Sequence, residues 1–291
     1  MAGKPAPVYN GEAGGPRPWR DTPPEKEMTM PRIEIDASKC LGDGLCAEAC
    51  VAHCLKLEDG RAVVLPQAER FCIACGHCFA VCPAGAVSLD GTDSAQAEAA
   101  DTASLAPDAL ARLVRSRRSL RRFADRKVPR ELVEKALDAV RWAPTAVNRQ
   151  DIGWIALDDP ARIRALAACV VDAMRSCPGR EGECRAFDAG RDVIFRDAPL
   201  VLFAHAPREP LGLQAQDCTI ALTLLEHLFC TMGLGTTWAG YAVATAMQAP
   251  SVARFLGLGE DRNVFAGCMA GWPAIGYLRV PPRRPLRLTW I

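Results

Sequence analysis

Eight of the chain's 14 cysteines fall between Cys40 and Cys82, and their spacing is the first sign of chemistry in this sequence. In the stretch FCIACGHCFAVCPAGAV, the cysteines follow C-x2-C-x2-C-x3-C, with a proline directly after the last one. This spacing is typical of thiolates that hold iron–sulfur clusters, the fourth cysteine ligating a second cluster. A structural zinc site normally needs two separated C-x2-C pairs instead. The pattern therefore favours iron–sulfur chemistry at Cys72, Cys75, Cys78 and Cys82.

An earlier half-motif, SKCLGDGLCAEACVAHC, repeats this spacing 32 residues upstream, with Asp43 where a cysteine is expected. The two half-motifs together resemble a two-cluster bacterial-type ferredoxin. That resemblance implies one 4Fe–4S cluster held by Cys72, Cys75, Cys78 and Cys50, and a first cluster held by Cys40, Cys46 and Cys82.

The ligand at position 43 leaves the type of the first cluster open. A carboxylate is a harder and weaker ligand for cluster iron than a thiolate. Three outcomes follow: Asp43 ligates a 4Fe–4S cluster, that iron is lost to leave 3Fe–4S, or Cys54 takes its place. His53 and His77 lie among these ligands, and we expect them to donate to cluster sulfur or to be exposed.

A second stretch with chemistry is the segment ALARLVRSRRSLRRFADRKVPR, which carries nine Arg or Lys residues and one Asp. Alternating Arg and Ser side chains supply bidentate and hydroxyl contacts to a terminal phosphate. The alternative is a solvated basic face, or a surface for nucleic acid. The segment by itself does not decide between them.

The surrounding motifs resemble those of the FMN-dependent nitroreductase family. In that family an R-x-S-x-R-x-F segment precedes a helix and an A-P-[ST]-x-x-N-x-Q loop, which corresponds here to RRSLRRF and APTAVNRQ. Two later segments, GLGTTWAGY and GWPAIGYLRVPPRRP, also agree. The four motifs occur in order and span most of residues 113–284. A ferredoxin module ahead of such a domain resembles a ferredoxin-fused branch of the family.

The resemblance implies an FMN site built from four segments and no separate catalytic residue. The phosphate and ribityl chain would be contacted by Arg117, Arg118, Ser119 and Arg121, and by Arg283 and Arg279 from the C-terminal motif. The flavin would be bordered by Pro144, Thr145, Ala146 and Asn148, from the partner subunit of a homodimer, with Gln150 in the same loop. Its isoalloxazine edge would lie along Trp238, Ala239 and Gly240. Asp151 stands where the family often has proline, and Tyr241 is a candidate proton donor whose simpler role is packing.

Composition and charge bound the class of protein. Hydrophobic residues make up 49% and charged residues 24% of the 291 residues, which is ordinary for a soluble globular chain. The net charge of +1 indicates binding neither to nucleic acid nor to a membrane surface. The first twenty residues have no apolar core of a signal peptide, so a secreted disulfide scaffold is excluded and a cytoplasmic protein is expected.

The elements that must position these residues fall into four regions. We expect a disordered tail at residues 1–30, a two-cluster ferredoxin domain at 31–90, a linker at 91–108 and a nitroreductase-like domain at 109–291. Apolar periodicity predicts helices at 128–140, 161–174 and 214–232, and strands at 60–65, 153–157, 200–204 and 264–270. The uncharged stretch 228–253 is interpreted as a helix end, a glycine turn and a packed loop, not a membrane span. The predicted class is α+β.

These observations predict an oxidoreductase that passes electrons between iron–sulfur clusters and FMN. It would reduce, or in reverse oxidise, a small organic substrate such as a nitroaromatic, quinone or activated alkene. Reduced ferredoxin or NAD(P)H would be the donor. The alternative hypothesis is a redox relay or an oxygen or iron sensor without turnover of a small molecule.

Overall fold

The computed structural model describes residues 32–100, 106–208 and 212–291, and the structural statements below refer to these residues. The tail expected at residues 1–30 lies outside them, as does the middle of the expected linker. Two differences concern that linker. Strand β5 (Thr92–Asp93) pairs with the strand before it, and helix α4 (Pro107–Ser116) begins inside the expected linker.

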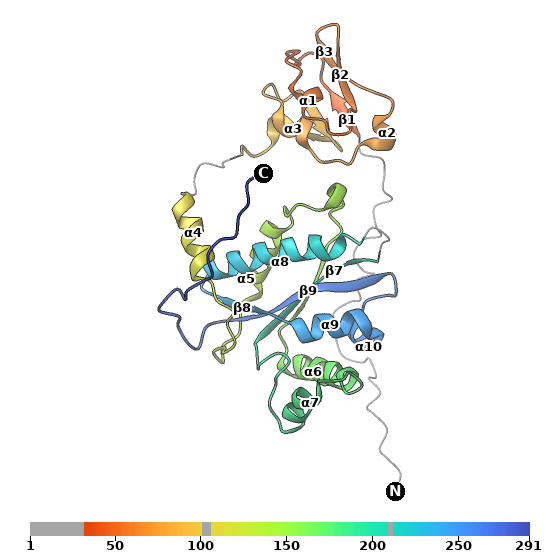
Figure 1. Ribbon diagram of the computed structural model, residues 1–291. Coiled ribbons are helices and arrows are strands. Elements are labelled where there is room, and N and C mark those ends of the chain that lie inside the picture. Colours follow the sequence, from red (N-terminus) through yellow and green to blue (C-terminus); the bar gives the residue numbers. More distant parts are fainter. Residues whose placement is uncertain (1–31, 101–105, 209–211) are drawn as a thin grey trace.

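The N-terminal part is a small module of short strands and helices at the top of Figure 1. Its elements are β1 (Ile33–Ile35), α1 (Leu45–Glu48), β2 (Leu55–Glu58), β3 (Arg61–Val64), α2 (Ala68–Phe71), α3 (His77–Val81), β4 (Val87–Leu89), β5 and the 3-10 turn η2 (Ser94–Gln96). The strands form a sheet of order β1-β4-β5 and a β2-β3 hairpin, all antiparallel. The hairpin turns through Asp59 and Gly60 with φ of 48° and 74°, the left-handed geometry of a tight hairpin. The strand predicted at 60–65 is confirmed as β3.

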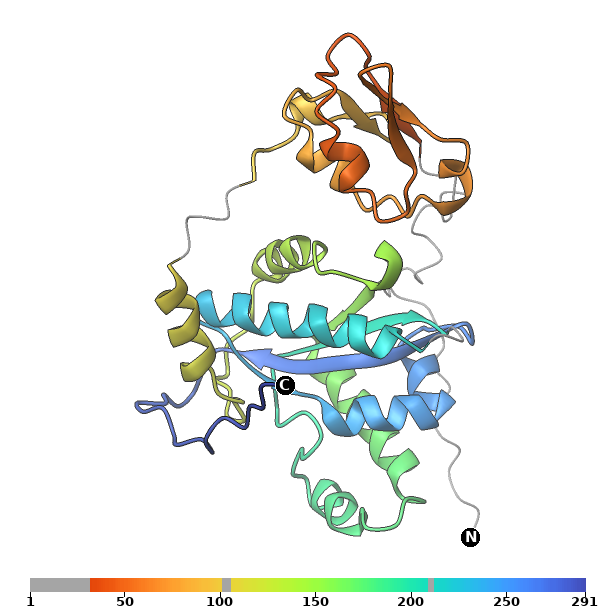
Figure 2. The ribbon, with the colours of Figure 1, turned by 45° about the horizontal axis from the view of Figure 1, so that its top comes forward.

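The C-terminal part is built on one antiparallel sheet of order β6-β7-β9-β8. Its elements are α4, α5 (Arg130–Val140), η3 (Ala146–Asn148), β6 (Gly153–Leu157), α6 (Pro160–Met174), α7 (Glu181–Asp188), β7 (Leu200–Pro207), α8 (Gln214–Thr231), β8 (Gly235–Trp238), α9 (Gly240–Gln248), α10 (Pro250–Phe255) and β9 (Arg262–Gly271). Helices α5 and α8 cover one face of the sheet, and α6, α9 and α10 cover the other (Figures 1 and 2). The predicted α+β class is confirmed for this part.

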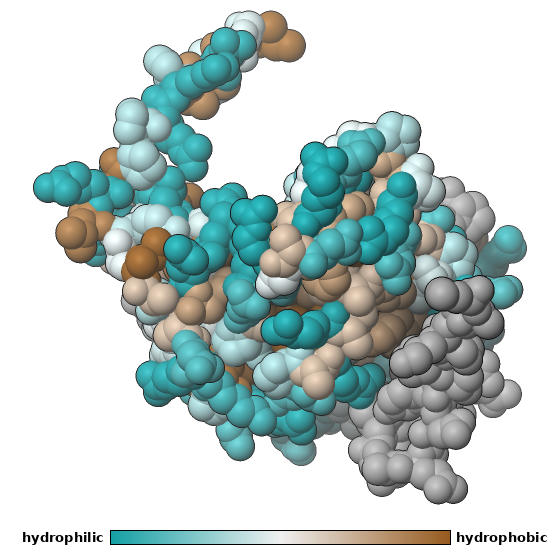
Figure 3. Space-filling view, turned by 90° about the horizontal axis from the view of Figure 1, so that it is seen from below, coloured by the Kyte–Doolittle hydropathy of each residue, from teal (hydrophilic) through white to brown (hydrophobic). Residues whose placement is uncertain are grey.

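The chain after β9 joins no helix or sheet. Residues 273–291, which we call the C-terminal arm, are exposed throughout, and Figure 3 shows an extended arm that stands away from the body with apolar side chains among polar ones. Leu278, Leu286 and Trp290 are 89%, 83% and 88% exposed. The arm therefore presents to solvent the kind of side chains that elsewhere in this chain form the core.

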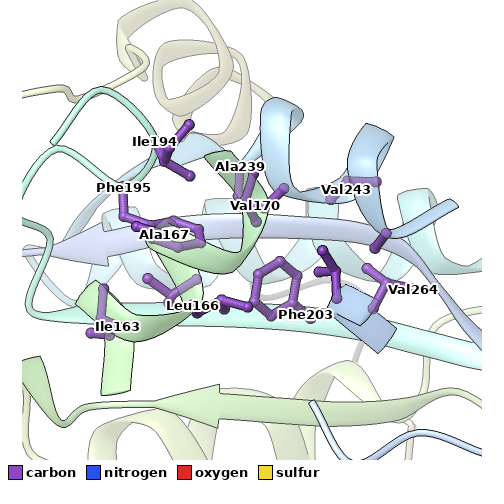
Figure 4. Packing of buried hydrophobic residues seen from close by; sticks show 14 of the residues in the cluster. Ile163, Leu166, Ala167, Val170, Ile194, Phe195, Phe203, Ala239, Val243 and Val264 are labelled. Atoms are coloured by element: carbon purple, nitrogen blue, oxygen red, sulfur yellow. The ribbon is translucent and has the colours of Figure 1, made fainter. Parts of the chain in front are cut away.

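Strand β7 is buried on both faces and separates two hydrophobic cores. On one face, Phe203 packs edge-to-face on Phe195 with ring centroids 6.3 Å apart, among residues of α6 and α9 (Figure 4). On the other face, Leu202 and Ala204 lie against α5 and α8. A strand covered on both sides reads as a continuous apolar run, which is why LVLFA was recognisable in the sequence.

Most of the predicted elements are confirmed within a few residues, including the helices at 128–140, 161–174 and 214–232. The packed loop expected after residue 233 is wrong. That stretch forms β8 and the helices α9 and α10. Thr236 and Thr237 pair with β9, and the Ala- and Val-rich run behind Gly240 packs as a helix, so the glycines mark the ends of elements and not a loop. No helix in the described residues has both the length and the apolar character that crossing a membrane requires.

A polar cluster lies inside this otherwise apolar sheet. His205 on β7 is 6% exposed, and its Nδ1 accepts a hydrogen bond from Arg262 Nε at 2.9 Å. Arg262 also donates to the Asp151 carbonyl at 2.8 Å. Burial, and then the Arg262 charge, lower the pKa of His205 to about 4, so the ring is neutral and can accept this bond.

We expect His205 to make the fold less stable in mild acid. An unfolded histidine has a pKa near 6.5, so between about pH 6.5 and 4 the unfolded chain binds a proton that the folded chain does not. The free energy of unfolding should fall as the pH falls through this window, by about 2 kcal/mol between pH 7 and pH 5 from His205 alone. Urea unfolding of the native chain and of His205→Asn at both pH values measures it. An equal fall in both proteins would contradict the assignment.

Candidate functional site

The arginine-rich segment is fastened by its backbone to two separate parts of the C-terminal domain. Leu120 N donates to the Thr236 carbonyl on β8 at 2.8 Å, and Ala124 N donates to the Trp272 carbonyl at 2.8 Å. The Arg122 carbonyl accepts a bond from Ala274 N at 3.1 Å. These bonds bring the segment beside β8 and beside the start of the C-terminal arm. Three of the motifs recognised in the sequence therefore meet at one edge of the sheet.

A pocket of about 210 Å³ lies at this junction. Its lining comes from the arginine segment, α8, β8 and the first residues of the arm, namely Ser116, Arg117, Arg118, Leu120, Glu226, Cys230, Gly233, Leu234, Gly235, Thr236, Pro273, Ile275, Gly276 and Tyr277. Gly235 is required at the junction because a Cβ there would overlap with the buried Leu120 side chain.

A buried carboxylate on α8 organises one wall of this pocket. Glu226 is 5% exposed and accepts hydrogen bonds from Thr236 Oγ1 at 2.8 Å and Trp238 Nε1 at 3.0 Å. Arg117 Nη1 lies 3.7 Å from the same carboxylate. One of the arginines expected at a phosphate is thus paired with an acidic side chain. Sequence reasoning missed Glu226 because it sits in an apolar helix with no motif around it.

The remaining phosphate candidates differ in how firmly they are held. Arg118 donates to the carbonyls of Arg117 and Arg115, at 2.7 and 3.0 Å. Arg121 is exposed, and its contact with the Ser119 carbonyl is long, at 3.4 Å. Arg279 and Arg283 are exposed residues of the C-terminal arm.

The loop at residues 144–150 is fixed from beneath by a second buried carboxylate of α8. Both oxygens of Asp217 accept from Ala146 N, at 3.1 and 3.2 Å, and Asp217 is 6% exposed. Thr145 Oγ1 accepts from Gln150 N at 3.0 Å. Asn148 has a left-handed φ of 55°, and its Nδ2 reaches the cysteine-rich module. Pro144 lies exposed at the start of this loop. No motif in the sequence indicated that Asp217 would hold this loop.

The third predicted segment lies where β8 ends and α9 begins. The Trp238 side chain is 42% exposed, whereas Ala239 is buried and its N–H donates to the Gly267 carbonyl on β9 at 2.9 Å. Gly240 begins α9. The hydroxyl of Tyr241, the candidate proton donor, donates a hydrogen bond to Glu183 Oε1 at 2.7 Å, and the Arg180 guanidinium lies over its ring. That hydrogen bond raises the pKa of Tyr241. Because Glu183 lies on α7, the same bond connects α9 to α7.

The cysteines of the N-terminal module form two sets. The titratable groups near enough to Cys46 to raise the pKa of its thiol are those of Cys82, Cys40 and Asp43. Around Cys78 they are Cys50, Cys75 and Cys72. Each set joins both half-motifs. In each half-motif the third ligand position, Cys46 or Cys78, lies on a short helix that follows a left-handed glycine, Gly44 or Gly76. This is the grouping that the resemblance to two-cluster ferredoxins implies.

Polar hydrogens point at several of these sulfurs. Backbone N–H groups donate to Cys40, Cys50 and Cys82, at 3.4, 3.2 and 3.3 Å. His77 is exposed, one of the two outcomes expected for it, and its Nδ1 lies 3.0 Å from Cys75 Sγ. Such donors stabilise thiolate charge, whereas burial raises the pKa of the Cys78 thiol to about 11.

The structure also shows where Cys54 and Asp43 lie, the two residues that the sequence offers as the missing ligand of the first set. Cys54 is buried beside Cys50, Cys72 and Cys78, so the structure puts it with the second set and not with the first. Asp43 Oδ1 accepts from Leu45 N at 3.1 Å. A small cavity of about 20 Å³ is lined by the second set and by Cys54. Within the described residues, no three His, Cys, Asp or Glu side chains converge on one metal ion.

Comparison with known proteins identifies the C-terminal part. The pattern of the Nitroreductase family matches residues 114–272. A protein of Methanothermobacter thermautotrophicus, named as a candidate NADH dehydrogenase/NAD(P)H nitroreductase, is 26% identical over 165 residues, which cover 55% of this chain and 75% of that protein.

Solved structures share the fold at low identity. A nitroreductase with bound FMN from Bacteroides fragilis superposes with a TM-score of 0.53 and 17% identity, over 62% of this chain and 98% of that one. A nitroreductase with bound FMN from Desulfitobacterium hafniense gives 0.53 and 19%, over 64% and 100%. At these identities the likeness establishes the fold of this part of the chain.

The contribution of the buried Glu226 carboxylate to stability can be tested by substitution. Glu226→Leu leaves the Thr236 hydroxyl and the Trp238 indole without an acceptor, so we expect a loss of about 2–4 kcal/mol in the free energy of unfolding. Glu226→Gln keeps one acceptor oxygen and should lose less. Urea unfolding followed by tryptophan fluorescence compares the two variants. Equal losses would mean that the cavity, and not hydrogen bonding, sets the cost.

Proposed function

The chain belongs to the nitroreductase family over residues 114–272, and from this premise we propose that it is an FMN-dependent oxidoreductase that exchanges electrons with iron–sulfur clusters in its N-terminal module. The observation that carries the proposal is the attachment of the arginine segment to β8 and to the chain after β9. The related structures from B. fragilis and D. hafniense hold FMN, which supports the choice of cofactor. When bound, FMN would exchange electrons singly or in pairs, and iron–sulfur clusters would carry them singly.

The donor set at the edge of the sheet suits a phosphate. The exposed guanidinium of Arg121 and the hydroxyl of Ser119 supply strong donors, and Arg117 and Arg118 add positive charge. Glu226 holds Arg117 at one orientation and offsets part of that charge, so the segment is fixed before a ligand arrives. Arg279 and Arg283 would complete the phosphate contacts from the arm.

The flavin ring would lie between the end of β8 in one subunit and the 144–150 loop of the partner subunit in the proposed homodimer. Asp217 accepts a hydrogen bond from Ala146 N, and Thr145 Oγ1 accepts one from Gln150 N, so the loop backbone is held in place. The half-exposed Trp238 indole gives an apolar edge whose orientation Glu226 sets. These residues orient a ring and exclude water from one side of it.

The two thiolate sets suit two cubane clusters. A four-iron cluster is held with one thiolate on each iron, so its ligands surround a volume and need not converge on a point. The second set supplies four thiolates, Cys50, Cys72, Cys75 and Cys78, around a cavity. The first supplies three thiolates and Asp43, which leaves 4Fe–4S and 3Fe–4S open.

The substrate class is a small organic acceptor such as a nitroaromatic, a quinone or an activated alkene. The donor would be reduced ferredoxin or NAD(P)H, and the name of the M. thermautotrophicus relative includes NAD(P)H. The reverse direction, oxidation of a substrate, uses the same residues. Fourteen free cysteines suit the reducing conditions of the cytoplasm.

A homodimer is the assembly we propose. The C-terminal arm carries exposed apolar side chains over residues 273–291, and surfaces of that kind mark protein contacts. Covering the arm with a second copy of the chain would remove these side chains from water and bring Arg279 and Arg283 onto a subunit surface.

A redox relay or sensor without small-molecule turnover is the second candidate. Asp43 favours it, because one of its oxygens is already held by Leu45 N and an iron facing a carboxylate is exchangeable. Turnover of any acceptor under anaerobic conditions with a chemical reductant would count against this function.

The first experiment is to measure iron, acid-labile sulfide and extractable flavin per chain in anaerobically purified protein. We expect one FMN and about eight irons if Asp43 or another group completes the first cluster, and about seven irons if that cluster is 3Fe–4S. Seven irons would also favour the sensor. Iron without flavin would contradict the proposed enzyme, and flavin without iron would contradict the clusters.

Arg121→Ala tests the phosphate site. Loss of one charge-assisted hydrogen bond should weaken FMN binding roughly 10- to 100-fold and leave the iron content unchanged. Arg122→Ala is the matched control, because Arg122 is adjacent and exposed but is not among the proposed phosphate contacts. Affinity is measured by titrating flavin-stripped protein with FMN and following flavin fluorescence. An equal loss in both variants would point to general charge and not to a specific contact.

A further inference from the structure

One side chain of the flavin-bordering loop bonds directly to the cysteine-rich module. Asn148 Nδ2 donates to the Ile73 carbonyl at 3.1 Å and to the Ala74 carbonyl at 2.8 Å. These two residues are the spacer between Cys72 and Cys75. The side-chain amide thus makes both of its hydrogen bonds to the backbone of a single cysteine loop.

The Asn148 side of this contact is rigid. Ala146 N is held by the buried Asp217, and Asn148 N donates to the Thr145 carbonyl at 3.0 Å. Asn148 itself has a φ of 55°, a left-handed conformation that asparagine adopts more readily than most residues. Helix α8 therefore sets where the amide points.

The cysteine side is held as well. Ala74 has a φ of 49° and Gly76 a φ of 73°, so the loop folds back tightly between its thiolates. His77 Nδ1 lies 3.0 Å from Cys75 Sγ, which fixes that sulfur from within the module. The carbonyls of Ile73 and Ala74 are left facing outward toward Asn148.

The contact is made to the loop of the second thiolate set. Cys72 and Cys75 flank it, and both belong to the set around Cys78, together with Cys50. Asn148 makes its two bonds to this ligand loop and not to the loop that carries Cys40 and Cys46. The geometry therefore gives the two sets unequal positions relative to the flavin-bordering loop.

We infer that Asn148 is a positioning residue that docks the second thiolate set, Cys50, Cys72, Cys75 and Cys78, against the flavin-bordering loop, so that electrons cross between the two modules through this set. The inference rests on the proposed function. Each crossing moves one electron and no atoms, the electrons coming one at a time from the reduced ferredoxin named above. Two crossings supply the pair that a two-electron acceptor takes up.

The test uses the full chain with Asn148→Asp. Aspartate keeps the left-handed backbone but replaces the donor with a carboxylate that faces two carbonyl oxygens. Loss of two hydrogen bonds should lower the equilibrium constant for docking by roughly tenfold or more. Small-angle X-ray scattering should report a larger radius of gyration, and hydrogen–deuterium exchange of residues 72–77 should accelerate.

Val147→Asp is the matched control. Val147 is the preceding residue, is 57% exposed and has a similar φ of 47°, so the variant adds the same charge to the same loop without removing the donor. We expect its scattering and exchange to equal those of the native chain. Asn148→Gly is a second variant, which removes the donor without adding charge and tolerates the same φ; it should behave like Asn148→Asp.

The outcomes separate this inference from the proposed function. Iron and flavin content, measured on the same samples, report on the cofactors, whereas scattering and exchange report on docking. Full cofactor content with unchanged scattering and exchange in both Asn148 variants would overturn the inference and leave the proposed function standing. Undocking in both variants, with native behaviour of Val147→Asp, supports it. A transient reduction experiment should then give at least tenfold slower electron transfer between the modules.

Discussion

Helix α8 carries two carboxylates that are almost completely buried, Asp217 near its start and Glu226 nine residues later. A buried carboxylate is costly unless hydrogen bonds surround it, so each one holds its partners in place. Asp217 holds the 144–150 loop, and Glu226 holds β8 together with Arg117. Nine residues of helix span about 13.5 Å. One rigid element thus holds in place both segments that the proposed flavin sites of the dimer use.

The same helix links that site to the cysteine-rich module. From Asp217 the contacts run through Ala146 to Asn148, and from Asn148 to the loop between Cys72 and Cys75. The arrangement explains how a small module joined through residues 97–106 can keep a defined orientation toward a much larger domain.

The sequence was sufficient for the local elements and for the motifs. Periodicity located α5, α6 and α8, and the apolar run LVLFA located β7, because burial on one or two faces leaves a direct trace in residue order. Glu226 and Asp217 left no such trace, since a buried carboxylate within an apolar helix looks like any other surface residue of that helix. The β6-β7-β9-β8 order and the Asn148 contact depend on residues that are 30 to 75 positions apart in the sequence. The stretch after Gly233 was misjudged because its glycines end elements instead of forming a loop.

The exposed C-terminal arm has a thermodynamic consequence for the proposed dimer. Leu278, Leu286 and Trp290 gain nothing from burial while a subunit is alone, so their contribution to stability exists only in the assembled state. Arg279 and Arg283 lie on the same arm as these side chains. Subunit association and cofactor retention would then be linked equilibria, each strengthening the other. Dilution alone would release flavin, and added flavin would hold dilute subunits together.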